Sequence, residues 1–235
     1  WVNNFNSKKL PDHYYAMDWN TLYPIETYIQ SSADRKGFPY NLAQYSGGNY
    51  QVITATPYGN SITVDMAEAA VTGEELGADS ITDLLTVSFS SPDYIGHTYG
   101  PNSVQEEDCF LRLDKDLGEF LNFLDKKIGK GEYLVFLTAD HGAANVPAFL
   151  NAHKIPAGNF NNEKVTAALN KYLNENFNVN NLATGILNYQ VYLNRNVIAT
   201  KGLNKDAVYA KTIEFLLQDL SVDRAFALDA LNQTT

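Results

Sequence analysis

The sequence predicts an α/β fold, and three stretches carry that prediction. Residues 84–89 (LLTVSF) and 133–137 (YLVFL) are short apolar runs without polar alternation. Such runs, rich in β-branched and aromatic residues, are typical of strands buried on both faces of a parallel sheet. Residues 103–128 between them have the spacing of an amphipathic helix. Strand, helix and strand together make one right-handed βαβ unit, in which both strands end at the same edge of the sheet.

The chain before the first run divides into an irregular part and a helix. Residues 1–48 are rich in aromatic residues, Asn and turn residues, and we expect an irregular segment with short helices. Asn60 or Ser61 can cap a helix that runs to about Thr72, with Gly73 as its end.

The helix predicted over residues 103–128 has the clearest signals in the chain. Ser103 and Glu106 have the spacing of a capping box, and Gly129 supplies a stop. Apolar residues recur at three- and four-residue intervals along it, which gives the helix one face that would pack on the sheet: Phe110, Leu113, Leu117, Phe120 or Leu121, Leu124 and Ile128.

The pattern of predicted elements changes after Gly142. Residues 147–158 have loop composition, and residues 163–177 and 203–220 have helical patterns. Residues 185–193 have the pattern of a strand, which residues 197–200 could pair with across a turn at 194–196. A helix, two strands and a helix form a small α+β lobe, commonly an insertion beside a main sheet.

Two groups of polar residues follow the apolar runs. Asp93 and His97 come after the first run, and Asp140 and His141 come after the second, with Gly142 permitting a bend. A carboxylate with an imidazole is a usual half-site for zinc. The alternative is that Asp93 caps a helix and that both histidines are ordinary polar residues, since each pattern alone is short. The repetition at successive strand ends favours a metal site.

Several segments together resemble one known family. They are WNTLYP (19–24), TATPYGNSITVDMA (54–67), SFSSPDYIGHTYGP (88–101), the helix FLRLDKDLGEFLNFLDKK (110–127) and VFLTADHGAA (135–144). These resemble the alkaline phosphatase superfamily, within it the phosphate-irrepressible alkaline phosphatases and type I phosphodiesterases/nucleotide pyrophosphatases of bacteria. The resemblance implies a three-layer α/β/α core, here partial, with a small α+β insertion lobe. It also implies two zinc ions, one held by Asp93 and His97 and the other by Asp140 and His141.

The resemblance also implies parts that lie outside these residues. In the family a Thr or Ser nucleophile, a further Asp ligand and the phosphate contacts precede the WNTLYP-like segment, and another His ligand follows well after the DHG motif. We therefore expect a partial chain with no catalytic nucleophile of its own, inactive by itself. The division expected is a cap segment over 1–48, part of the metal-binding core over 49–158, the insertion lobe over 159–220 and a return to the core over 221–235.

The activity implied is hydrolysis of phosphoric esters, with a small phosphate ester as substrate. A phosphomonoesterase is the first expectation and a phosphodiesterase or nucleotide pyrophosphatase is the alternative, while sulfatases and metal-dependent phosphomutases share the fold. A further alternative is a non-catalytic metal-binding or structural protein of this fold. The resemblance implies export to the periplasm or cell surface of a bacterium.

Composition sets further bounds on partners. The net charge of −10 and the absence of a Lys/Arg run argue against binding nucleic acid through a basic surface. No apolar stretch approaches the roughly 18 residues of a membrane-spanning helix. The single cysteine, Cys109, excludes an internal disulfide and a cysteine-rich zinc site.

Overall fold

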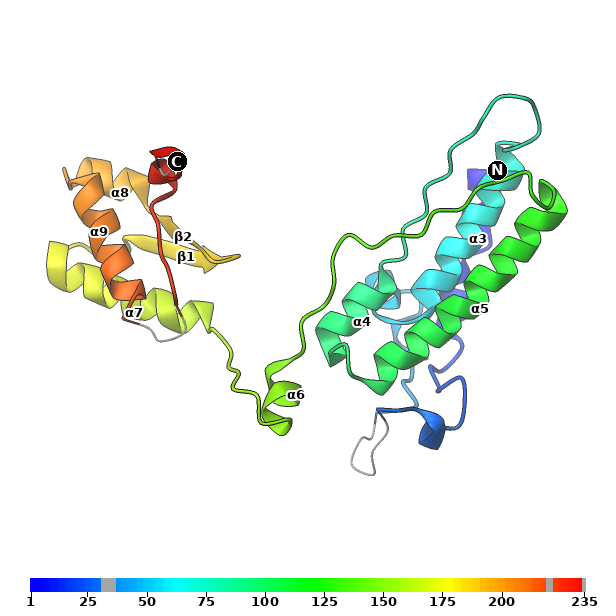
Figure 1. The fold of residues 1–235 in the computed structure, drawn as a ribbon, viewed down its shortest axis with the longest axis horizontal. Helices are drawn as coiled ribbons and strands as arrows, with labels where there is room; N and C mark the ends of the chain where they lie inside the picture. Colours follow the sequence, from blue (N-terminus) through cyan, green and yellow to red (C-terminus); the bar gives the residue numbers. More distant parts are fainter. Residues whose placement is uncertain (31–36, 219–221, 234–235) are drawn as a thin grey trace. The chain divides into compact units, whose positions relative to one another are not determined.

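The computed structural model describes residues 1–30, 37–218 and 222–233, and the chain divides into two compact units, residues 1–156 and 157–235. The first unit contains the following helices (Figure 1): α1 (Val2–Ser7), α2 (Leu10–Tyr15), η1 (Ile25–Thr27), η2 (Ala43–Tyr45), η3 (Tyr50–Ala55), α3 (Tyr58–Gly73), α4 (Ser91–Tyr99), α5 (Val104–Lys127) and α6 (Pro147–Ala152). The short elements before residue 48 agree with the irregular segment predicted there. The four-part division of the chain stays a prediction.

The helix predicted over 103–128 is confirmed as α5. The Ser103 hydroxyl oxygen accepts a hydrogen bond from the backbone N–H of Glu106, which satisfies one free donor of the first turn. Its apolar face packs on α3 through a cluster of buried side chains, Val64, Ala67, Val71, Phe120 and Leu124. Helix α3 begins at Tyr58 with Pro57 as its N-cap, so the predicted cap residues Asn60 and Ser61 lie inside the helix. Their side chains donate to Cys109 and Asp116 on α5.

The two apolar runs differ from the prediction of buried strands. Residues 84–89 and 133–137 have no assigned strand pairing, and in Figure 1 they lie in the extended stretches that lead away from α3 and α5. Val87, Phe89 and Tyr133 pack against the α3–α5 cluster, whereas Leu84, Phe136 and Leu137 are 80% exposed or more. A strand needs a neighbour for its backbone hydrogen bonds, and the described residues supply none to these runs, so the βαβ unit is not formed among them.

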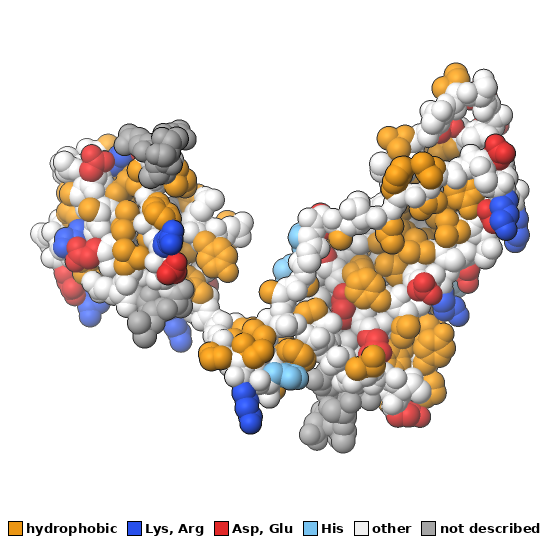
Figure 2. All heavy atoms as spheres, viewed as in Figure 1, with side chains coloured by type: hydrophobic (Ala, Val, Ile, Leu, Met, Phe, Trp, Pro, Cys, Tyr) orange, Lys and Arg blue, Asp and Glu red, His pale blue; other side chains and the backbone are white. Residues whose placement is uncertain are grey.

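The exposed apolar side chains give this unit an apolar face. Figure 2 shows them gathered over α3, α5 and the extended stretches. None of the helices among the described residues is both long and apolar enough to cross a membrane.

A second core of the first unit is aromatic. Tyr15, Trp19, Leu42, Ile53, Tyr58, Ile95 and Cys109 form one buried cluster, which draws on η3 and on α2, α3, α4 and α5. The backbones of Trp19 and Tyr40 exchange two hydrogen bonds of 3.0 Å, so the segment before η1 is fastened beside the segment before η2. This core holds α4 against the rest of the unit.

The second unit is a small α+β arrangement. It consists of α7 (Asn162–Phe177), β1 (Ala183–Leu187), β2 (Gln190–Leu193), α8 (Arg195–Thr200), α9 (Lys205–Leu216) and η4 (Leu228–Gln233) (Figure 1). The strands pair antiparallel, and α7 packs on them around the fully buried Leu169, Leu173 and Leu182. The helix predicted over 163–177 is confirmed, with the Asn161 side chain as its cap.

The prediction that residues 185–193 form one strand paired with residues 197–200 was wrong. Residues 185–193 are not one strand but parts of two, because Asn188 and Tyr189 both have left-handed backbone angles and form a two-residue turn. Residues 197–200 belong to α8, whose first turn is capped by the Asn194 side chain. The helix predicted over 203–220 is α9, which ends at Leu216, and residues 219 and 220 of that prediction lie outside the described residues.

Candidate metal centre

Helix α4 carries the first pair of candidate ligands. Pro92 stands near its start, where a missing N–H costs nothing, and Asp93 lies in the first turn, where a carboxylate is favoured. Asp93 and His97 are one helical turn apart and both exposed, whereas Ile95 on the opposite side is fully buried. The helix therefore presents the carboxylate and the imidazole together at the surface.

The second pair lies after the extended run 133–137. Oδ1 of Asp140 accepts a hydrogen bond of 3.0 Å from the backbone N–H of His141. Nδ1 of His141 is 3.0 Å from the carbonyl oxygen of Gly142. Because a carbonyl oxygen can only accept a hydrogen bond, Nδ1 carries the proton in the neutral ring. Nε2 is then the nitrogen whose lone pair is free to bind a metal ion. That nitrogen is 3.5 Å from Oδ2 of Asp140.

The two pairs lie beside each other. Nε2 of His97 is 3.5 Å from Oδ1 of Asp93, and Nε2 of His141 is 3.8 Å from the same oxygen. Asp93 therefore stands between the two imidazoles. The structure brings all four residues together.

The distances within the pairs suit two ligands of one metal ion. They are longer than a good hydrogen bond. Two ligands at 2.0 to 2.2 Å from a tetrahedral zinc are about 3.4 Å apart, which is close to the 3.5 Å of each pair. Among the described residues no three His, Cys, Asp or Glu side chains form a group able to hold a metal ion. The residues thus offer two two-ligand half-sites of suitable donor chemistry.

Burial and charge act on the groups near the site. The pKa of His141 is raised, first by its hydrogen bond to the Gly142 carbonyl and then by the charges of Asp140 and Asp93. Glu106 on α5 is buried beneath α4, with its carboxyl oxygens near Gly96, and burial followed by the charge of Asp93 raises its pKa to about 7. Oε2 of Glu106 has no hydrogen-bond partner among the described residues.

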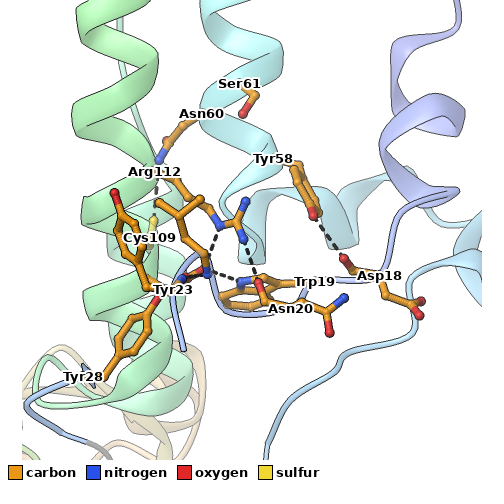
Figure 3. A network of polar contacts seen from close by, with 12 residues as sticks. Asp18, Trp19, Asn20, Tyr23, Tyr28, Tyr58, Asn60, Ser61, Cys109 and Arg112 are labelled. Atoms are coloured by element: carbon orange, nitrogen blue, oxygen red, sulfur yellow. Dashed lines mark hydrogen bonds and ion pairs between the residues drawn. The ribbon is translucent and has the colours of Figure 1, made fainter. Parts of the chain in front are cut away.

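A second carboxylate on α5, that of Asp108, is fully buried and fully bonded. Its Oδ2 accepts from Nε1 of Trp19 at 2.7 Å and from Nε of Arg112 at 2.8 Å. Its Oδ1 accepts from the backbone N–H of Leu22 at 2.6 Å and from the hydroxyl of Tyr28 at 2.5 Å. Figure 3 shows Trp19, Tyr28 and Arg112 of this network, with Arg112 donating also to the carbonyl of Asn20. The carboxylate ties residues 19–28 to α5.

Sequence reasoning identified the four candidate ligands but missed Glu106 and Asp108. The sequence pattern predicts Glu106 as the partner of Ser103 in a capping box, and its backbone N–H does donate to the Ser103 hydroxyl. The only local signal for Asp108 is its four-residue spacing from Arg112. Its other donors come from residues far away in the chain, so no local pattern indicates them.

Known proteins of one family match this chain over nearly its whole length. The family model described as type I phosphodiesterase / nucleotide pyrophosphatase matches residues 2–227. Alkaline phosphatase PafA of Elizabethkingia meningoseptica is 43% identical over 244 residues, which cover 98% of this chain and 44% of that protein. Alkaline phosphatase PhoV of Synechococcus elongatus is 43% identical over 247 residues, covering all of this chain and 44% of the relative.

Solved structures give the same result in three dimensions. The crystal structure of wild-type alkaline phosphatase PafA superposes with a TM-score of 0.89 at 42% sequence identity, and the match covers all of this chain and 47% of that one. The chain therefore spans somewhat less than half the length of the relatives that it matches.

Proposed function

From the premise that this chain belongs to the type I phosphodiesterase / nucleotide pyrophosphatase family of the alkaline phosphatase superfamily, we propose that it supplies zinc ligands to a phosphoric ester hydrolase. Its fold is alkaline-phosphatase-like, with part of the α/β core present. One ion would be held by Asp93 and His97 and the other by Asp140 and His141. The observation that carries this proposal is the convergence of the four side chains, with the same 3.5 Å separation in both pairs.

The chain's own residues prepare the donor atoms for this role. The bond from Nδ1 of His141 to the Gly142 carbonyl orients the ring so that Nε2 faces the two carboxylates. Oδ1 of Asp140 is engaged by a backbone N–H, which leaves Oδ2 on the side of His141. Helix α4 holds Asp93 and His97 in fixed register. When bound, zinc would act as a Lewis acid toward a phosphate oxygen.

The substrate class proposed is a small phosphate ester. The relatives PafA and PhoV are alkaline phosphatases, which favours a phosphomonoester. Membership of the type I phosphodiesterase / nucleotide pyrophosphatase family favours a phosphodiester or nucleotide pyrophosphate as the alternative. By the family resemblance we also propose that a Thr or Ser outside these residues is the nucleophile and that the enzyme is exported. Two adjacent zinc ions would offset the acidity of the chain for an anionic substrate.

Zinc titration calorimetry tests the ligand assignment. We expect the metal-free chain to bind two zinc ions, and Asp93→Ala and Asp140→Ala each to remove or weaken one of them by tenfold or more. Asp114→Ala is the matched control, because Asp114 is an exposed aspartate on α5. Equal zinc binding by all four proteins would refute the assignment.

A further inference from the structure

Trp19 connects the buried Asp108 carboxylate to helix α4. Trp19 is 1% exposed, and its indole N–H donates to Oδ2 of Asp108 at 2.7 Å. Its ring system and the ring of Tyr99 form a T-shaped pair with a centroid distance of 6.3 Å and an interplanar angle of 79°. Tyr99 is the last residue of α4, two positions after His97. The contact between the rings of Trp19 and Tyr99 thus links the anchored indole directly to the helix that carries both Asp93 and His97.

The contacts leave the indole little freedom. Its backbone is bonded twice to Tyr40, whose ring also packs on Tyr99 at 5.7 Å. Ile95 of α4, fully buried, belongs to the same cluster as Trp19. Because such cores are close-packed, a shift of the indole must be taken up by its neighbours. The nearest rings are those of Tyr40 and Phe38, at 5.1 and 5.3 Å, and Tyr99 and Ile95 are the residues of α4 in the same cluster.

We propose that Asp108 is a positioning residue for the Asp93–His97 pair and that it acts through Trp19 and Tyr99. The inference rests on the proposed zinc-binding function of that pair. The carboxylate fixes the position of the indole, and the indole packs against Tyr99 in the C-terminal turn of α4. The helix in turn sets the 3.5 Å distance between Oδ1 of Asp93 and Nε2 of His97. Groups hydrogen-bonded directly to a metal ligand affect metal affinity by about 10- to 100-fold, and we expect the effect of a residue that acts through packing to lie at the low end of that range.

The structure offers a matched pair of variants. Trp19→Phe keeps an aromatic ring in the core and removes the donor to Oδ2, whereas Tyr28→Phe removes a donor to Oδ1 of the same carboxylate. Both delete one hydrogen bond to Asp108, but the ring of Trp19 packs against α4. Asp108→Asn tests the carboxylate itself, and the two Phe variants keep the proposal testable if Asp108→Asn does not fold.

The experiment is a Co²⁺ titration of the 235-residue chain, followed by the visible absorption of the bound ion, with hydrogen exchange of the metal-free α4 amides. We expect Trp19→Phe to weaken Co²⁺ binding at the His97-dependent site about tenfold, to alter the spectrum, and to speed exchange at Ile95 and His97. We expect Tyr28→Phe to change Co²⁺ affinity less than twofold and to leave α4 exchange unchanged.

Each outcome decides one of the two claims. Equal Co²⁺ affinities and equal α4 exchange for wild type and Trp19→Phe overturn the positioning role. Equal weakening by both Phe variants also overturns it, since that reflects general loosening. If wild type and His97→Ala bind Co²⁺ equally, the zinc-site proposal fails instead, and the exchange of the α4 amides alone then decides whether Trp19 positions the helix.

Discussion

Nε2 of His141 lies 3.8 Å from Oδ1 of Asp93, and this contact joins the end of an extended stretch to the first turn of α4. It brings an imidazole from one motif to the carboxylate of the other. Neither motif by itself specifies the contact, because it depends on how α4 and the stretch after residue 137 pack around α3 and α5. The contact also influences how His141 titrates.

The first prediction concerns the pH dependence of zinc binding. The hydrogen bond from His141 to the Gly142 carbonyl, followed by the charges of Asp140 and Asp93, raises the pKa of this imidazole above its ordinary 6.5. Zinc competes with the proton for Nε2, so zinc affinity should fall as the pH drops through the raised pKa. NMR titration of the zinc-free ring should give a midpoint above 6.5. The midpoint should move down in Asp140→Asn, and a midpoint at or below the ordinary value in wild type would contradict the argument.

The second prediction concerns close packing between α3 and α4. A Cβ atom on Gly59 would lie 2.3 Å from Oγ of Ser91 and 2.9 Å from the backbone oxygen of Ile53. The serine can rotate away but the carbonyl cannot, so Gly59→Ala should lower the free energy of unfolding by about 1–3 kcal/mol. Urea denaturation measures this.

Gly118 provides the matched control for that substitution. It lies exposed in the middle of α5, where a Cβ would meet no atom of the described residues within 4 Å. Gly118→Ala should therefore raise the free energy of unfolding by about 0.5–1 kcal/mol through helix propensity alone. If both substitutions had the same sign, close packing at Gly59 would not be the deciding factor.

The third prediction concerns Glu106. Its pKa of about 7 in the folded chain lies above the ordinary 4.5, so the folded state binds more protons than the unfolded state between these values. Stability should therefore fall as the pH rises from about 4.5 to 7, by up to about 3 kcal/mol at 1.36 kcal/mol per pKa unit. Glu106→Gln should remove this loss and exceed wild type in stability at pH 8.

Metal-free urea denaturation at pH 5 and pH 8 is the measurement for Glu106. The exposed Glu132 supplies a control, since Glu132→Gln should keep the pH dependence of wild type. A Glu106→Gln variant with that same pH dependence would show that the buried carboxyl does not titrate as stated.

The fourth prediction concerns the turn between β1 and β2. Tyr189 has a φ of 60° and is 94% exposed, so the backbone is strained while the side chain gains almost no burial. Glycine suits this position of the two-residue turn, and Tyr189→Gly should raise the stability of the second unit by about 0.5–1 kcal/mol. Gln190→Gly, one residue into the strand, should instead lower it. Thermal unfolding of both variants distinguishes these outcomes, and destabilisation by Tyr189→Gly would show that the tyrosine makes a favourable contact.

Local signals were sufficient for the elements whose hydrogen bonds close within one segment. The Ser103 cap and the apolar spacing predicted α5 because a helix satisfies its own backbone, and the pattern of residues 163–177 predicted α7 in the same way. The spacing of Asp93 and His97 was also a local quantity. Once residues 91–99 are helical, one turn separates the two side chains and places them on one face.

The tertiary structure decided what depends on distant partners. The runs 84–89 and 133–137 have the composition of strands, yet they form no strand pairing among the described residues. A strand makes its backbone hydrogen bonds to a neighbouring strand, and composition does not say whether one is present. The approach of His141 to Asp93 and the bonds to Asp108 from Trp19, Leu22 and Tyr28 likewise join segments far apart in the chain. A single segment carries no information on what will lie across from it. The sequence by itself therefore determined the candidate ligands and the main helices, and packing decided how those ligands meet and which buried carboxylate supports them.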